Sequence, residues 1–208
     1  MCGRFSLEAH PEVLAQAFSL ASAPPLAPRK NICPTQPVLA IRQEAPGRRE
    51  AVLLEWGLIP QWMKTPPSRP MINARSETLT EKPSFKSAFR HRRCLIPASG
   101  YYEWRTEERG KQAYHFTLAQ GGVFAMAGLW ETQLSPDGSE RETCTIITTE
   151  STGKVREIHH RMPVILPPQH FETWLDNANP RNAELQGLLL PFQDNSLSIR
   201  PVPSPSGF

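Results

Sequence analysis

Proline is the residue that most restricts what this chain can fold into. The sequence holds 22 prolines against 12 glycines, and the prolines are spread along its whole length. Each proline fixes its own φ angle and lacks a backbone N–H, so it interrupts helices and is excluded from the interior of sheets. The sequence therefore predicts many short strands and helices joined by rigid turns, and it argues against long helices.

The composition indicates a folded globular protein. Hydrophobic residues make up 39% of the chain and charged residues 21%, which supports a buried core and is untypical of disorder. A length of 208 residues favours one domain over residues 1–208, with residues 202–208 as a frayed tail. The net charge of +3 permits binding to nucleic acid but does not by itself indicate it.

Nothing in the sequence predicts contact with a membrane. The longest apolar stretch, Gly121 to Trp130, is about half as long as a membrane span. The first residues lack the apolar segment that a secretory signal peptide needs. We therefore expect the protein to work in the cytoplasm.

Apolar runs of strand type alternate with short segments of helical type. Strands are predicted over residues 38–43, 50–56, 71–75, 93–97, 101–105, 113–118, 123–131, 143–149 and 197–202. Helices are predicted over residues 11–20, 84–89, 152–158, 168–175 and 181–189. Many antiparallel strands with few helices predict an α+β fold, in which a curled, largely antiparallel, barrel-like sheet carries helices on its periphery.

The cysteines and histidines do not have the spacing of a metal site. The four cysteines are Cys2, Cys33, Cys94 and Cys144. Their separation excludes a Cys-x-x-Cys motif, and the last three are predicted to be small buried apolar residues. His159 and His160 are adjacent, and the side chains of neighbours in a strand or helix point apart. We therefore expect no metal and no cofactor.

Cys2 differs from the other cysteines, because removal of Met1 would make it the N-terminal residue. It would then carry an amine and a thiol on adjacent carbons, which react with an aldehyde first as an imine and then as a closed thiazolidine ring. About a tenth of an α-amine is neutral at pH 7, against under about one in a thousand for lysine. Cys2 is therefore a candidate nucleophile, and the alternative is a frayed terminus without a role.

Two polar clusters could supply further chemistry. Asn73 and Arg75 lie at the end of a short strand, where the amide could hold an oxygen and the guanidinium could bind a phosphate. Glu103 lies between aromatic residues in the segment 101–104. Desolvation by apolar rings would raise the pKa of its carboxyl and suit it to proton transfer. The alternatives are a turn in which Asn73 bonds to its own backbone, and a solvated glutamate.

Three other residues suggest acid–base chemistry or base stacking. His159 could act as a general acid or base near neutral pH, and Arg161 faces the same way if this segment is extended. Trp62 lies in a polar stretch and is predicted to be exposed, where it could stack on unpaired bases. Trp56 lies in an apolar strand and is predicted to be in the core.

Taken together and in this order, seven segments resemble the SRAP family (SOS response-associated peptidase-like proteins, the abasic site processing proteins). The matching segments are 1–5, 31–35, 56–60, 73–78, 92–104, 127–130 and 159–163, so the resemblance extends over nearly the whole chain. Any one of these segments would mean little by itself, but all seven in order are specific.

The resemblance implies an enzyme of the DNA damage response that binds single-stranded DNA at an abasic site and joins it through the N-terminal cysteine. Cys2 corresponds to the nucleophile, Asn73 to the residue that orients the sugar or the Cys2 backbone, and Glu103 and His159 to proton-transfer groups. The implied DNA contacts are Arg4, Asn31, Trp62, Arg75 and Arg161. The resemblance further implies a monomer in a bacterial cytoplasm with lyase-type chemistry.

Two other functions stay open at this point. The first is a cysteine peptidase that removes its own Met1, with the Cys2 thiolate as nucleophile and His159 or the α-amine as base. The second is a single-strand DNA-binding module without catalysis, which would use Trp62 and the arginines.

Overall fold

Prolines begin some of the helices, and none lies inside a described helix. In the computed structural model, which describes residues 2–63, 67–108, 110–134, 138–178 and 182–205, helices α1 (Pro11–Phe18) and α2 (Pro83–His91) and the 3-10 helix η2 (Pro168–His170) each begin with proline. A missing N–H costs nothing there, because the first amides of a helix have no partner within it. The longest described helix, α2, has nine residues, and no described helix is long and apolar enough to span a bilayer.

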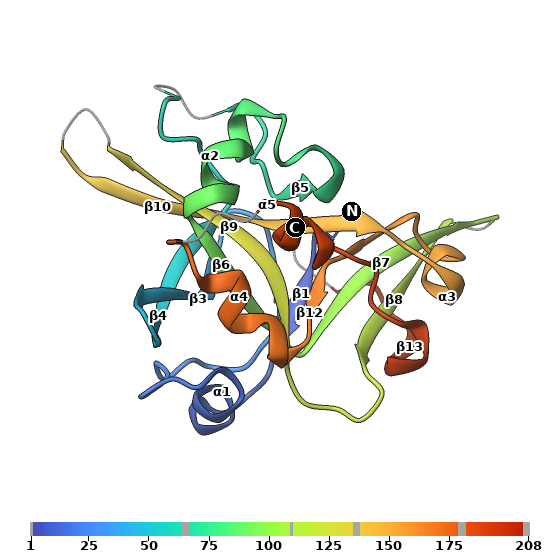
Figure 1. Cartoon of the computed structure of the whole chain (residues 1–208). Coiled ribbons are helices and arrows are strands. Elements are labelled where there is room, and N and C mark those ends of the chain that lie inside the picture. The colour runs from blue at the N-terminus through green and yellow to red at the C-terminus, as the bar shows by residue number, and fades with distance from the viewer. Residues whose placement is uncertain (1, 64–66, 109, 135–137, 179–181, 206–208) are drawn as a thin grey trace.

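One group of strands forms a five-stranded sheet in the order β13-β8-β7-β1-β2, with all neighbours antiparallel. Its strands are β1 (Phe5–Leu7), β2 (Arg29–Ile32), β7 (Gly100–Glu107), β8 (Gly110–Leu118) and β13 (Leu197–Val202). The strand that follows Cys2 therefore lies between two others, which holds the start of the described chain inside the fold (Figure 1).

A second group of strands closes into a barrel. Its members are β3 (Pro37–Ala45), β4 (Arg48–Trp56), β6 (Arg93–Ala98), β9 (Phe124–Leu134) and β10 (Glu140–Glu150). The path β10-β4-β3-β6-β9 closes because β9 also pairs with β10. The shorter strands β5 (Asn73–Arg75), β11 (Arg161–Pro163) and β12 (Ile165–Leu166) extend it. The predicted α+β fold with a curled, largely antiparallel sheet is confirmed, with two parallel pairings, β10–β4 and β10–β5.

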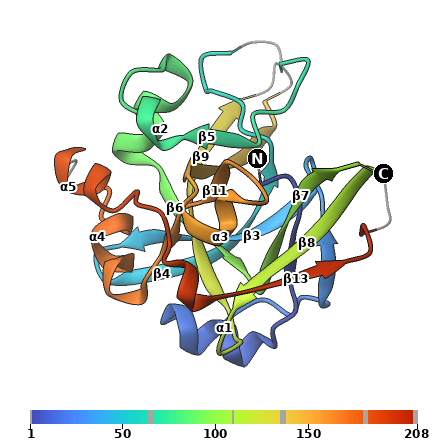
Figure 2. The same cartoon turned by 90° about the vertical axis from the view of Figure 1, so that its right-hand side faces the viewer.

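The helices lie around the outside of the sheets, as the two views in Figures 1 and 2 show. The remaining elements are η1 (Ser76–Thr78), α3 (Gly153–Arg156), α4 (Phe171–Leu175), α5 (Asn182–Gly187) and η3 (Asp194–Ser196). The predicted helix over 152–158 is only one turn long, and the one over 168–175 divides into η2 and α4. Residue 181 of the predicted helix over 181–189 lies outside the described residues.

The core contains most of the residues that the sequence places there. Trp56, Cys94 and Cys144 are fully buried, as predicted. Cys33 is only half-buried, and the prediction of a buried Cys33 is wrong because this residue follows β2, the edge strand of the five-stranded sheet. The predicted frayed tail begins at Val202, the last residue of β13. Ser204, within that tail, accepts a hydrogen bond on its Oγ from the indole N–H of Trp104 at 3.1 Å. Residues 206–208 of that tail lie outside the described residues.

A buried arginine joins the ends of two helices. Arg93 is 0% exposed, and its guanidinium donates to the carbonyls of Phe89 (2.8 Å) and Arg90 (2.6 Å) in α2. It also donates to the carbonyl of Trp174 at 2.7 Å and to that of Asp176 at the end of α4. The last carbonyls of a helix have no partner within it, so one side chain satisfies both helix ends. Burial lowers the pKa of Arg93 to about 10, which leaves it charged at neutral pH.

We expect Arg93→Met to lower the free energy of unfolding by about 3–5 kcal/mol, because it leaves several buried carbonyls without a donor. Urea unfolding at pH 7 measures this change. Arg90→Met is the matched control, since the Arg90 side chain is exposed on α2, one of the two helices that Arg93 joins. Its effect on the free energy of unfolding should stay within about 0.5 kcal/mol. Equal stability of the two variants would show that the guanidinium does not hold the helix ends.

Candidate active site

Cys2 lies inside the molecule, directly before β1. It is 0% exposed, and its Sγ is 4.0 Å from the carbonyl oxygen of Arg4. Strand β7 runs antiparallel to this segment, with Phe5 opposite Tyr101 and the amide of Tyr102 donating to the Arg4 carbonyl at 2.9 Å. The register places Glu103 beside the residues that precede β1. Residue 1 lies outside the described residues, so the predicted removal of Met1 stays a prediction.

The Cys2 thiol is in a setting that keeps it protonated. Burial raises the pKa of this thiol well above its usual range, and the charge of nearby Glu103 raises it further. A low-pKa thiolate, which most cysteine nucleophiles rely on, is therefore not present in the resting site. Any reaction of this sulfur needs a proton acceptor at the moment of attack.

Glu103 is a buried carboxyl group that titrates near neutral pH. It is 2% exposed, and burial raises its pKa to about 7. The direction of this shift agrees with the sequence prediction, because the carboxyl is buried and is not on a solvated face. A group that is about half ionised at pH 7 can both donate and accept a proton.

His159 lies next to Glu103. Its Nδ1 is 3.8 Å from Glu103 Oε1 and 3.0 Å from both the amide nitrogen and the carbonyl oxygen of Arg161. Burial lowers the pKa of His159 to about 4, so the ring is neutral at pH 7. A neutral imidazole keeps one nitrogen as an acceptor and the other as a donor.

The expectation that the two histidine side chains point apart is wrong. The rings of His159 and His160 stack with their centroids 4.5 Å apart. These residues lie in a bend before β11 and not in a strand or helix, so the alternation of side chains does not apply. Within the described part of the chain, no group of three or more His, Cys, Asp or Glu side chains is arranged to hold a metal ion.

Asn73 presents a buried acceptor. It lies in β5, parallel to β10 and opposite Ile146. Its Nδ2 donates to the carbonyl of the preceding residue, Ile72, at 2.9 Å, although Asn73 lies in a strand and not in the turn considered as the alternative. Its Oδ1 is buried and has no hydrogen-bond partner among the described residues. A buried carbonyl oxygen without a donor is costly, which indicates that a ligand or water supplies one.

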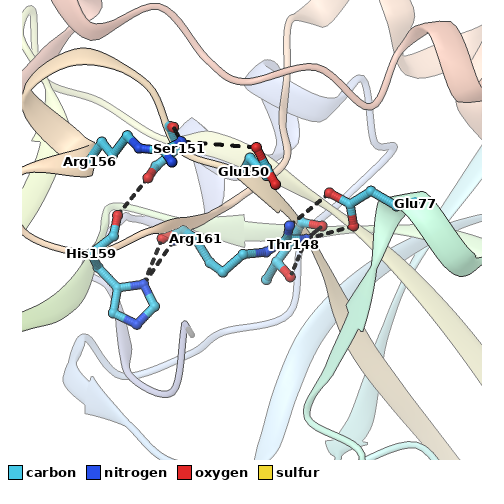
Figure 3. Close-up of polar contacts among 7 residues, drawn as sticks. All are labelled: Glu77, Thr148, Glu150, Ser151, Arg156, His159 and Arg161. Carbon is cyan, nitrogen blue, oxygen red and sulfur yellow. Dashed lines mark hydrogen bonds and ion pairs between the residues drawn. The ribbon is translucent and has the colours of Figure 1, made fainter.

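The arginines implied as DNA contacts lie in different settings. Arg75 is exposed at the end of β5, whereas Arg4 is buried and its Nη1 lies 3.4 Å from the carbonyl of Gly3. Arg161 is also buried, and its guanidinium forms a bidentate pair with Glu77 at 2.7 and 3.0 Å (Figure 3). The sequence assigned no role to Glu77; its place in the polar run 73–78 was the only signal.

The remaining predicted residues lie on loops and edges. Trp62 is 61% exposed on the segment between β4 and β5, as predicted. Asn31 is half-buried in the edge strand β2, where its Oδ1 lies 3.7 Å from Cys33 Sγ. The structure thus brings Cys2, Glu103 and His159 together in the interior, while Trp62 and Arg75 face solvent.

The site thus combines a buried thiol, a carboxyl group with a pKa near neutrality and a neutral histidine. A family model described as SOS response associated peptidase (SRAP) matches residues 1–205. The chain belongs to the SRAP family. Several relatives carry the name abasic site processing protein, and two of them show the range of identity. YoaM of Bacillus subtilis is 39% identical, over 98% of this chain and 92% of its own length. YedK of Escherichia coli is 31% identical, over 84% of this chain and 79% of its own length.

Solved structures confirm the SRAP-like fold. A protein from Bacteroides thetaiotaomicron superposes with a TM-score of 0.89 at 29% identity, over 98% of this chain and 93% of that one. A second, from Bordetella bronchiseptica, gives a TM-score of 0.86 at 26% identity.

Proposed function

We propose that this protein captures abasic sites in single-stranded DNA by a covalent thiazolidine link to Cys2, once Met1 has been removed. The observation that carries the proposal is the burial of Cys2 beside Glu103 and His159. The open-chain sugar of an abasic site is an aldehyde, which is the partner that an adjacent amine and thiol require. The names of the relatives support the lesion as substrate.

The order of bond formation follows from the protonation states. The thiol is protonated, so the α-amine of Cys2 attacks the aldehyde carbon first and forms a carbinolamine. Protonation of its hydroxyl releases water and leaves an iminium ion. The Cys2 sulfur then adds to the iminium carbon as its proton leaves, which closes the five-membered ring. One water is lost overall, and no bond is oxidised or reduced.

Glu103 is suited to both proton transfers. With a pKa of about 7, its protonated form can deliver the proton to the departing hydroxyl, and the resulting carboxylate can take the thiol proton at ring closure. His159, neutral and next to Glu103, is suited to move the hydroxyl proton when the sugar ring opens. The open Oδ1 of Asn73 can accept a hydrogen bond from the sugar or from the Cys2 amine.

The surface residues supply affinity for the DNA strand. Arg75 is exposed at the strand that carries Asn73 and can contact a phosphate. Trp62 presents an aromatic face to solvent on which a base can stack. Arg4, Asn31 and Arg161 remain candidate DNA contacts. Because a single strand has no base pair to open, the damaged sugar can enter the buried site at low cost.

One assay tests the proposal directly. Wild-type protein is incubated with a single-stranded oligonucleotide that carries one abasic site, then boiled in detergent and separated on a denaturing gel. We expect a shifted protein band that survives boiling. The controls are the same oligonucleotide with an intact base, and the abasic oligonucleotide reduced to an alcohol beforehand. A protein with mass-confirmed loss of Met1 that leaves the lesion unmodified would contradict the proposal.

Arg75→Ala should weaken DNA binding and reduce its dependence on salt. A lost phosphate contact on single-stranded DNA lowers the slope of log affinity against log salt by about 0.7. Fluorescence anisotropy over a range of salt concentrations measures the slope. Arg48→Ala is the control, since Arg48 is exposed at the β3–β4 turn and paired with Glu44, and its slope should equal that of the wild type. An unchanged slope for Arg75→Ala would exclude the phosphate contact.

The peptidase function suggested by the family description is less well supported by the site. A cysteine peptidase needs a thiolate, and burial together with Glu103 keeps the Cys2 thiol protonated. His159 does not offset this, because it is neutral and its Nδ1 already lies against the backbone of Arg161. Turnover of a general peptide substrate by the wild type, and its loss in Cys2→Ala, would favour the peptidase.

A further inference from the structure

Three elements meet at the guanidinium of Arg161. Both oxygens of Glu77, from η1, accept hydrogen bonds from it at 2.7 and 3.0 Å, and its Nη2 also donates to the carbonyl of Thr148 in β10 at 2.6 Å (Figure 3). The Arg161 side chain is 8% exposed and that of Glu77 is 46% exposed. A bidentate arginine–carboxylate pair restricts the orientation of both groups. The charge of Arg161 is therefore balanced within the protein.

The backbone of the same arginine holds the catalytic histidine. The amide N–H of Arg161 donates to His159 Nδ1 at 3.0 Å. The carbonyl oxygen of Arg161 lies at the same distance from Nδ1, so the backbone of Arg161 decides which ring nitrogen carries the proton. Ser151 supports the same bend, because its Oγ donates to the His159 carbonyl at 2.6 Å and its amide donates to the His160 carbonyl at 3.1 Å. The position of the ring beside Glu103 thus depends on where Arg161 begins β11.

We infer that Glu77 is a positioning residue: it holds Arg161 at the start of β11 and thereby sets the ring position and the tautomer of His159. The role of His159 in this inference rests on the proposed function, whereas the contacts around Arg161 do not depend on it. Partial burial opposes ionisation of Glu77, yet the hydrogen bonds from Arg161 lower the pKa of this carboxyl. The carboxylate is therefore charged at neutral pH and remains paired. A phosphate that used Arg161 would first have to displace it.

The first test separates positioning from DNA binding. We expect Glu77→Ala to slow crosslinking at saturating abasic DNA by roughly 10- to 100-fold, because a misplaced catalytic group costs about that much. The dissociation constant for DNA should not rise, since an acidic side chain is removed from the binding surface. Glu77→Asp should restore part of the rate. Glu44→Ala is the matched control, because Glu44 is similarly exposed and paired with Arg48, and its rate should equal that of the wild type.

The second test does not depend on any reaction with DNA. Nitrogen-15 NMR of the histidine rings in the free protein reports which nitrogen is protonated. We expect His159 in the wild type to hold a single tautomer, and in Glu77→Ala to exchange between both. This result can be obtained even if the wild type does not crosslink, so it separates failure of this inference from failure of the proposed function.

Three results would overturn the inference. In one, Glu77→Ala keeps the wild-type tautomer of His159 and the wild-type rate at saturation. In the other, Glu77→Ala binds DNA more tightly and reacts at the wild-type rate, which would make Glu77 a competitor of phosphate for Arg161. Loss of rate with an unchanged tautomer and no rescue by Glu77→Asp would also contradict it.

Discussion

Cys2→Ala should form no boiling-resistant DNA–protein product, a loss of at least about 1,000-fold, because the sulfur that closes the ring is gone. The α-amine remains, so the variant can still form an imine, which water reverses. Cys2→Ser should behave in the same way, since a hydroxyl is a much weaker nucleophile than a thiol at neutral pH. Addition of borohydride during the reaction should trap the imine of both variants as a stable amine.

The denaturing gel, run with and without borohydride, measures these outcomes. Binding to abasic DNA should stay within about twofold of the wild type, because Cys2 is fully buried and adds no charge to the surface. Both replacements are small, so removal of Met1 is expected to proceed as before and can be checked by intact mass. A boiling-resistant product from Cys2→Ala without reductant would exclude the thiazolidine.

Glu103→Gln should make the protein more stable and less active. The carboxyl of Glu103 has a pKa of about 7 in the folded protein, against an ordinary value of 4.5 for a glutamate in water. The folded state therefore binds this proton more tightly than the unfolded state does. The contribution of Glu103 to stability is therefore largest below pH 4.5 and is lost as the pH rises through about 7, a change of roughly 3 kcal/mol.

Glutamine keeps the shape of the side chain and removes its ionisation. At pH 8 we expect Glu103→Gln to unfold at a higher urea concentration than the wild type, by up to about 3 kcal/mol, and near pH 4 the two should be equal. Crosslinking should slow by about 100- to 10,000-fold, the usual effect of removing a general acid or base. A Glu103→Gln variant that is less stable than the wild type at pH 8, or that reacts at the wild-type rate, would contradict the role of Glu103 as a buried proton-transfer group.

Much of the fold could be predicted because the long strands have clear local patterns. The strands β3, β4, β9 and β10 have 9 or 11 residues each, and proline and glycine mark their ends. The strands β1, β2, β11 and β12 have two to four residues each and were not predicted. A period of two cannot be recognised in so few residues, and these strands exist because neighbouring strands supply their hydrogen bonds.

The candidate site was predictable only where a local sequence pattern exists. Trp56 and Trp62 could be told apart because the first lies among apolar residues and the second among polar ones. The pairing of Arg161 with Glu77 could not be predicted, because the two residues are 84 positions apart and meet only where β10 lies between β5 and β11.

The amino-acid sequence by itself determined that Cys2, if Met1 is removed, would carry an amine and a thiol on adjacent carbons, the pair that can react with an aldehyde. It also determined that the elements are short, since proline acts on its own residue and its neighbours. Only the tertiary structure decided that the thiol is protonated, that Glu103 titrates near pH 7 and that His159 is neutral. These properties depend on burial and on groups from distant segments, and no local pattern contains that information.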